Sequence, residues 1–137
     1  MRPVLLALTL SAASAAGAQT AAFDAVAVAP KSHRVLFEDD KIRVLRVEVA
    51  PGATEPVHEH PWQSIMYFEQ PQPITYIEYR LIGGRPVETR RIDAPALNAT
   101  QTVRGEAEGL HAVMNRGAAP FVAVRVEFKG EASTGDR

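Results

Sequence analysis

The sequence contains no cysteine. This absence excludes disulfide bonds, thiolate metal ligands and a cysteine nucleophile. Any metal ion must therefore be held by histidine, carboxylate, amide or water. The 15 lysines and arginines nearly balance the 16 aspartates and glutamates, so the formal net charge is only −1. With no basic stripe, the sequence gives no reason to expect nucleic-acid binding.

Several other patterns are missing. After the first segment, no stretch shows an amphipathic helical period over three turns, which argues against a helical fold. The chain also lacks a nucleophile elbow with a serine, histidine and aspartate order, a phosphate-binding loop and paired helical carboxylates. These absences argue against hydrolase and nucleotide-binding functions.

The N-terminus has the pattern of an export signal. A positive start at residues 1–2 precedes an apolar run at residues 4–10, and small residues follow at Ala16 and Ala18. The run is too short for a membrane span, which needs about 18 apolar residues or more. We therefore predict a signal peptide over residues 1–18, and a secreted or periplasmic protein without a membrane anchor after cleavage.

Short segments with a period of two, separated by glycine and proline, predict an all-β sandwich or barrel. The predicted strands cover residues 34–37, 42–49, 57–60, 64–68, 74–82, 87–92, 110–114 and 121–128. We expect a flexible N-terminal segment over residues 19–31, one β-barrel domain over 32–130 and a flexible C-terminal tail over 131–137.

Two histidines stand on either side of a glutamate in His58-Glu59-His60. Because side chains alternate along a strand, both rings point to one side and can reach one ion, whereas Glu59 points away. A third histidine, His111, lies in another predicted strand. Three histidines make a minimal site for a divalent metal. His33 precedes the first predicted strand, and we expect it to be a surface imidazole.

The spacing Gly52-x5-His58-x-His60, followed by His111-x3-Asn115, resembles the two motifs of the cupin superfamily. The resemblance covers most of the chain after its first segment. It implies a cupin-type double-stranded β-helix, a jelly-roll-like barrel that holds one divalent ion (Fe, Zn, Mn or Ni) between strands. It also implies His58, His60 and His111 as metal ligands, and a homodimer.

The sequence departs from these motifs at the acidic ligand. Cupins usually place a glutamate four or five positions after the second histidine, where this chain has Ser64 and Ile65. We therefore expect a site of three histidines without a carboxylate. By resemblance, three-histidine iron sites occur in cupins that oxidise thiols and diketones. Gln63 is either a substitute ligand or a solvent-facing amide at the barrel mouth, and the sequence leaves both open.

Aromatic and soft side chains are candidates for pocket walls. The candidates are Trp62, Met66, Phe68 and Tyr79. In the strand 74–82, alternation places an uncharged set of residues on one face and a charged set on the other. We predict that the uncharged set, which includes Thr75, Ile77 and Tyr79, faces the interior. No acid–base residue in the pocket is obvious from the sequence.

Two function classes remain open. The protein is either a metal-dependent dioxygenase or isomerase that acts on a small anionic or enolisable compound, or a non-catalytic periplasmic module that binds a small ligand or a metal. The expected partners are a small molecule and a second copy of the chain.

Overall fold

The computed structural model describes residues 22–132, and these residues form mainly antiparallel β-strands. The elements in chain order are α1 (Ala25–Val28), β1 (His33–Glu38), β2 (Ile42–Val49), β3 (His58–His60), β4 (Trp62–Gln70), β5 (Ile74–Ile82), β6 (Arg85–Ala94), β7 (Thr102–Gly105), β8 (Glu108–Asn115) and β9 (Phe121–Ala132).

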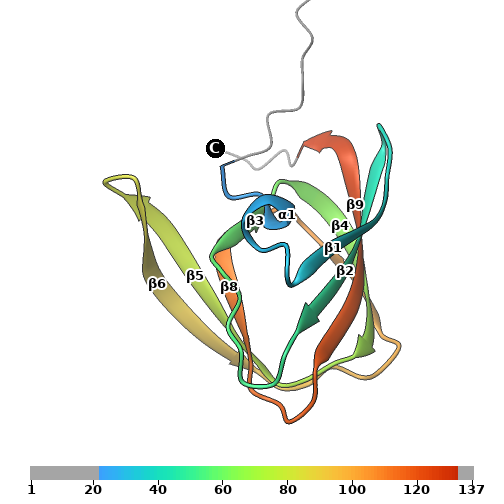
Figure 1. The fold of residues 1–137 in the computed structure, drawn as a ribbon, viewed down its shortest axis with the longest axis vertical. Coiled ribbons are helices and arrows are strands. Elements are labelled where there is room, and N and C mark those ends of the chain that lie inside the picture. The colour runs from blue at the N-terminus through green and yellow to red at the C-terminus, as the bar shows by residue number, and fades with distance from the viewer. Residues whose placement is uncertain (1–21, 133–137) are drawn as a thin grey trace, which may run out of the picture.

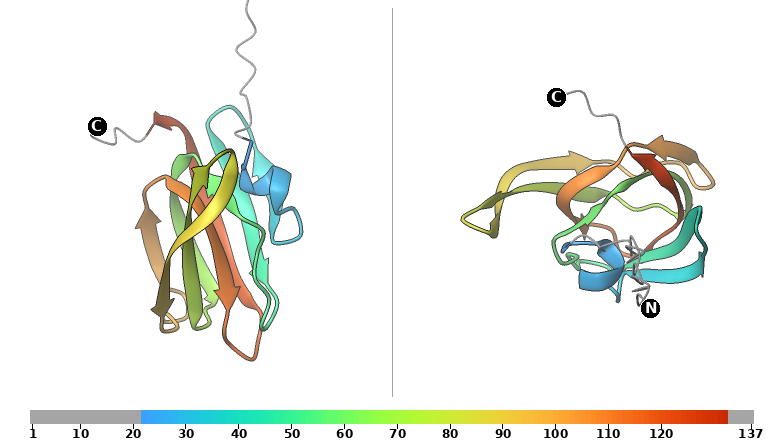
Figure 2. Two further views of the ribbon diagram at one scale, coloured as in Figure 1. Left: turned by 90° about the vertical axis from the view of Figure 1, so that its left-hand side faces the viewer. Right: turned by 90° about the horizontal axis from the view of Figure 1, so that it is seen from above.

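Two sheets face each other and enclose the interior of a barrel (Figure 1). The five-stranded sheet has the order β1-β2-β9-β4-β7, and the four-stranded sheet has the order β3-β8-β5-β6. Some neighbouring strands are far apart in sequence, as in the pairing of β2 with β9, whereas β1–β2 and β5–β6 are consecutive. The β5–β6 hairpin extends beyond the barrel wall, which is visible from above in Figure 2. The expected all-β barrel is confirmed.

The predicted strands 42–49 and 74–82 coincide with β2 and β5. The other predicted strands are present with shifted ends, because ladder bonds extend beyond the apolar period. The short edge strand β7 was not predicted. Its sequence Thr-Val-Arg-Gly has mostly exposed side chains, so it carries no periodic burial signal.

The apolar core lies inside the barrel, at one end. It contains the inward-facing residues Leu45, Val47, Val49, Phe68, Phe121 and Ala123. These positions alternate along β2, β4 and β9, as the period of a strand requires. Phe68 and Phe121 meet edge to face, with their ring centroids 5.9 Å apart. Burial of this cluster supplies the main hydrophobic contribution to folding.

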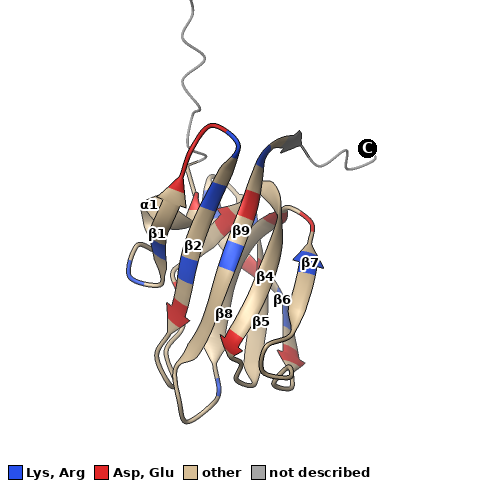
Figure 3. Cartoon of the chain, turned by 90° about the vertical axis from the view of Figure 1, so that its right-hand side faces the viewer, with Lys and Arg blue, Asp and Glu red and all other residues tan. Residues whose placement is uncertain are grey.

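Two of these strands, β2 and β9, also carry charged residues. Figure 3 shows basic and acidic positions along β2 and β9 in the middle of the five-stranded sheet. Some of them, including Arg43, Arg125 and Glu127, are at most 2% exposed and point inward. Buried charges are costly unless they are paired, so these residues indicate a polar region inside the barrel.

The described part of the expected flexible segment 19–31 is instead packed on the barrel. Residues 25–28 form α1, and the Asp24 side chain accepts a hydrogen bond from the Val26 backbone N–H as the helix N-cap. Asp24 also binds Arg43 through both carboxylate oxygens, at 3.0 and 2.9 Å. This buried ion pair holds the segment against the barrel. The segment was predicted to be flexible because its small residues show no periodic pattern.

The predicted signal peptide (1–18) lies outside the described residues, as does the predicted tail from residue 133 onward. Within residues 22–132, no helix is long and apolar enough to cross a membrane.

Candidate metal centre

All four histidines of the chain gather inside the barrel. His58 and His60 project from β3, His111 from β8 and His33 from the start of β1. The ring centroids of His58 lie 4.6 Å from His33, 5.1 Å from His60 and 4.4 Å from His111. Antiparallel pairing sets His58 opposite His111, so residues 53 positions apart meet across two strands. Each histidine is at most 3% exposed.

The hydrogen bonds of three rings decide which nitrogen can bind a metal. Nδ1 of His58 lies 2.8 Å from the Pro56 carbonyl oxygen, and Nδ1 of His111 lies 2.7 Å from that of Gly109. Because a carbonyl oxygen only accepts, each Nδ1 must carry the hydrogen. Nδ1 of His60 likewise meets a Glu127 carboxylate oxygen at 2.6 Å. The Nε2 lone pairs of these three rings are therefore free for a ligand.

Burial keeps these rings neutral. Desolvation lowers the pKa of His33 to about 2 and that of His58 to about 4, and neighbouring imidazoles add to both shifts. Desolvation also lowers the pKa of His60 and of His111. A neutral imidazole is the form that coordinates a metal, so the cluster is prepared for a cation rather than for an anion.

Carboxylates surround the histidines, which corrects the expectation of a site without a carboxylate. Glu108, at the start of β8, pairs with His60 across the sheet, and Arg125 donates to it from 2.5 Å. Desolvation alone would raise the pKa of Glu108, but the charge and the hydrogen bond of Arg125 outweigh it and the pKa is lowered to about 2. The carboxylate thus comes from β8, three residues before His111, and not from position 64 or 65. No local spacing rule pointed to it.

Two sets of side chains bring their ligand atoms within 4.8 Å of one another. One set is His33, His58 and His60, and the other is His60, Glu108 and His111. The predicted trio of His58, His60 and His111 is in one cluster, but the ligand atoms divide it between these two sets. The prediction that His33 is a surface imidazole is wrong. His33 pairs with Val47 of β2, whose side chain faces inward, so His33 faces inward too.

A cavity of about 190 Å³ adjoins the histidines. Met66 and Phe68, both predicted as pocket residues, line it together with Tyr76. The prediction that the face of β5 with Thr75, Ile77 and Tyr79 lines the interior is wrong, because the opposite face does so. Tyr76 points inward and stacks on His111 at a centroid distance of 4.9 Å, and its hydroxyl lies 3.2 Å from a Glu108 oxygen. Both faces of β5 carry buried residues, so polarity alone did not identify the inner one.

The other sequence candidates lie elsewhere. The Gln63 amide donates to Glu106 and accepts from Arg104 in an exposed cluster, so it is not beside the histidines. Trp62 packs under the Arg43 guanidinium, 4.8 Å from the ring centroid, at the end of the barrel. Tyr79 lines a separate hollow next to the β5–β6 hairpin. Strand ends and a bulge after Glu78 direct these side chains away from the cavity.

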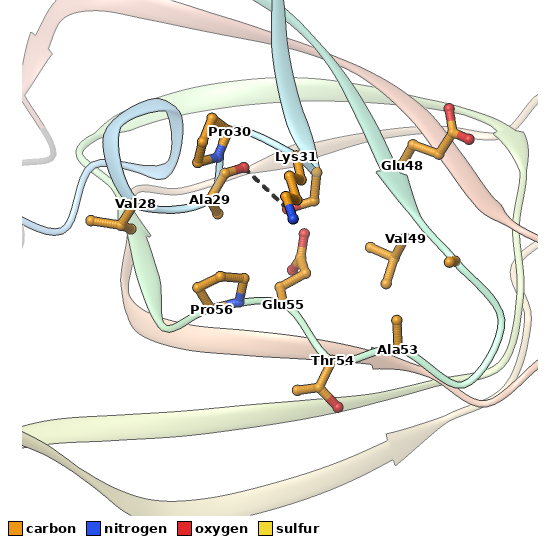
Figure 4. A pocket seen from close by; sticks show the side chains of 12 residues that line it. Val28, Ala29, Pro30, Lys31, Glu48, Val49, Ala53, Thr54, Glu55 and Pro56 are labelled. Carbon is orange, nitrogen blue, oxygen red and sulfur yellow. Dashed lines mark hydrogen bonds between the residues drawn. The ribbon is translucent and has the colours of Figure 1, made fainter.

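A second, larger cavity of about 570 Å³ opens between the end of α1 and the loop that precedes β3. Figure 4 shows the Glu55 carboxyl group near its centre, with Val49, Ala53 and Pro56 around it. Glu55 and Val49 line both cavities, so Glu55 separates the outer pocket from the histidines. Desolvation raises the pKa of Glu55 to about 7. Glu55 is therefore an acid–base group near neutral pH that the sequence did not reveal.

Solved structures share this arrangement of strands. A crystal structure of a cupin domain from Bordetella pertussis is 18% identical, with 71% of this chain and 91% of that chain covered and a TM-score of 0.53. The chain has the cupin fold. A structure from Bacillus halodurans is 15% identical over 71% of this chain and 69% of that chain, with a TM-score of 0.50.

A Klebsiella pneumoniae protein with a double-stranded β-helix domain is 23% identical, with 73% of each chain covered and a TM-score of 0.48. A scan of protein-family models gives no match, and a search of curated proteins finds no similar sequence. The evidence for a cupin therefore comes from the three-dimensional fold.

The residues inside this cupin barrel fit a divalent ion. Three imidazoles have their Nδ1 atoms tied to acceptors, and a carboxylate stands beside two of them. Nitrogen and oxygen donors of this kind suit iron, zinc, manganese or nickel, while the lack of thiolates disfavours softer ions. The cluster is thus a candidate site for one of these metals.

Proposed function

We propose that this protein is an exported, metal-dependent cupin enzyme, a dioxygenase or isomerase that acts on a small anionic or enolisable compound. The observation that carries the proposal is the convergence of neutral, oriented imidazoles with Glu108 beside a cavity. A bound divalent ion would supply Lewis acidity toward an anionic or enolisable group. Hydrogen bonds at Nδ1 fix the orientation of the His58, His60 and His111 rings, and Met66 and Phe68 give the cavity apolar walls.

Metal titration tests this proposal first. The protein is stripped with a chelator and then titrated separately with Fe²⁺, Zn²⁺, Mn²⁺ and Ni²⁺ while heat or metal content is measured. We expect one tightly bound ion per chain. His60→Ala should lower affinity most, because His60 belongs to both sets of ligand atoms. Gln63→Ala is the matched control, because Gln63 lies in the exposed cluster and should leave metal content unchanged.

Two further variants distinguish the ligand sets. If the ion is bound by the set that contains His33, His33→Ala lowers metal affinity far more than His111→Ala does. If His111→Ala has the larger effect, the ion is bound by the set that contains Glu108 and His111. Retention of full affinity in His60→Ala would refute the metal site.

Turnover separates the enzyme from the alternative, a non-catalytic binding module. Oxygen uptake and product formation are measured with the metal-loaded protein on diketones, phenolics and thiols. Turnover that disappears in the His60→Ala variant supports the enzyme. Stoichiometric metal without turnover on any of these would favour the binding module.

Export and pairing are part of the same proposal. Mass spectrometry of the exported protein should give a chain that starts at Gln19, and an intact Met1 in the cytoplasm would contradict export. β1 is an edge strand with Val35, Leu36 and Phe37 at least 37% exposed, which supports pairing with a second copy. Sedimentation should show a homodimer, and a monomer at micromolar concentration would argue against it.

A further inference from the structure

Three buried hydrogen-bond donors beside the histidines have no hydrogen-bond partner within the described chain. They are the Ser64 hydroxyl on β4 and the Nε and Nη2 groups of Arg125 on β9. Ser64 is 1% exposed and Arg125 is 2% exposed. Donors buried without acceptors are unfavourable, and few native side chains are left in this state. We propose that these donors form a carboxylate-binding subsite for the ligand of the neighbouring metal centre.

A cavity lined by the residues that carry these donors has room for such a group. It measures about 240 Å³, and its walls include Ser64, Gly105 and Arg125. Met66, Phe68, Glu108 and Arg125 also line the histidine cavity, so the two spaces are neighbours. Gly105 has no Cβ, and one built there would stand 3.6 Å from the Ser64 hydroxyl oxygen. Gly105 therefore lies directly beside Ser64 on the wall of this cavity.

The geometry of Arg125 selects a carboxylate. Nη1 donates to Glu108, which holds the guanidinium in place. Nε and Nη2 lie on the other edge of the guanidinium, the edge that presents two parallel donors to a carboxylate. Glu127 does not complete this edge, because its Oε1 lies 3.4 Å from Nε without hydrogen-bond geometry and Nη2 has no bond. A ligand carboxylate would satisfy both donors, with Ser64 close by.

The formal charges near this subsite are close to balanced. Asp24, Glu108 and Glu127 lie in ion pairs with Arg43 and Arg125. A divalent ion at the histidines adds two positive charges, and an anionic ligand group offsets part of them.

This inference extends the proposed function by naming the substrate class, a small carboxylate that also reaches the metal. The probes are glycolate, acetate and the neutral analogue glycolamide, each titrated by calorimetry into the metal-loaded protein. We expect glycolate to bind more tightly than glycolamide by at least about 10-fold, since a charge-assisted pair is stronger than a neutral one.

Variants of the two donors test whether the protein, rather than the metal alone, holds the carboxylate. Ser64→Ala removes a hydroxyl that makes no bond in the protein, so the variant should fold and bind metal normally. It should weaken glycolate binding by about 3- to 10-fold, the effect of one hydrogen bond. Arg125→Lys keeps the charge but loses the two-donor edge and should weaken binding further. Thr89→Ala, with an exposed hydroxyl on β6, is the control and should match the parent.

Metal affinity is measured for every variant, so that the two proposals fail separately. If metal binds but both Ser64→Ala and Arg125→Lys bind glycolate as the parent does, the subsite is refuted and the metal centre stands. If Arg125→Lys does not fold, Ser64→Ala alone decides. If no metal binds, glycolate is titrated into the metal-free protein, where loss of binding in Ser64→Ala supports the subsite and absence of any binding in the parent refutes it.

Discussion

The two ends of the barrel interior are built by the same strands but with opposite chemistry. On β2 the inward positions change from Arg43 to the apolar Leu45, Val47 and Val49, and on β9 they change from Glu127 and Arg125 to Ala123 and Phe121. The apolar end packs as a core that also forms a wall of the histidine cavity, while the charged end places buried ions beside His60.

The apolar end contributes mainly to the stability of the barrel, and the charged end contributes mainly to the candidate metal site. Apolar burial stabilises the barrel without a requirement for direction, whereas the charged end is tolerable only while each ion keeps its partners. Arg43, for example, is held by Asp24 on one side and by Glu127 at 2.5 Å on the other. The stability contributed by the apolar end therefore helps to keep the ion pairs of the charged end in place.

Acid should affect the charged end most. In metal-free protein the pKa of each histidine is lower in the folded state than the ordinary value of 6.5, so the unfolded chain binds more protons below that pH. Stability is therefore fully present above pH 6.5 and falls as pH decreases, by up to about 1.4 kcal/mol per histidine per pH unit. Urea denaturation between pH 7.5 and 5 measures this loss.

Glu55 changes stability with pH in the direction opposite to the histidines, so it serves as an internal control. Its folded pKa of about 7 exceeds the ordinary 4.5, so its contribution to stability increases as pH falls from 7 to 4.5. In Glu55→Gln the decline of stability below pH 7 should be steeper than in the parent. A pH-independent stability in the parent would show that the histidines are not buried in neutral form.

Removal of the charge of Glu127 should have the next largest effect. Glu127→Gln leaves Arg43 with Asp24 and Arg125 with Glu108 as their remaining counterions, and it weakens the acceptor for His60, so we expect a loss of about 3–5 kcal/mol in the free energy of unfolding. Metal affinity should also fall, by about 10- to 100-fold, because the His60 ring loses its orientation. Glu69→Gln, in an exposed pair with Arg46, is the control and should change neither quantity.

Truncation of a side chain at the apolar end should lower the stability of the protein but not its metal affinity. Leu45→Ala creates a cavity among fully buried neighbours, and we expect the free energy of unfolding to fall by about 2–5 kcal/mol. Metal affinity of the folded variant should stay within about 2-fold of the parent, because Leu45 is not among the residues that line the histidine cavity. A large loss of metal affinity in Leu45→Ala would show that the two ends are coupled.

The smallest effect is expected outside the barrel. Arg91 and Glu88 form an exposed ion pair on β6, with Arg91 more than half exposed. Solvent screens such a pair, so Arg91→Ala should leave the denaturation midpoint and the metal affinity unchanged. A clear drop in either would indicate that the β5–β6 hairpin packs on a second copy in solution.

The sequence alone determined the strands and one local part of the site. The period of two predicted β2 and β5 within their observed bounds and placed His58 and His60 on one face, because alternation is a property of the strand itself. Turn residues separated the strands for an equally local reason. The spacing of the histidines also pointed to the cupin barrel that the fold confirmed.

Tertiary structure decided which face of each strand became the interior and which distant residues met there. His33, Glu108 and Arg125 come from β1, β8 and β9, and no local spacing joins them. Tyr76 faces His111 only because β5 pairs with β8 in one register, and a shift of one residue would direct it outward. Periodicity assigns residues to faces, but long-range strand pairing chooses the inner face and thereby assembles the site.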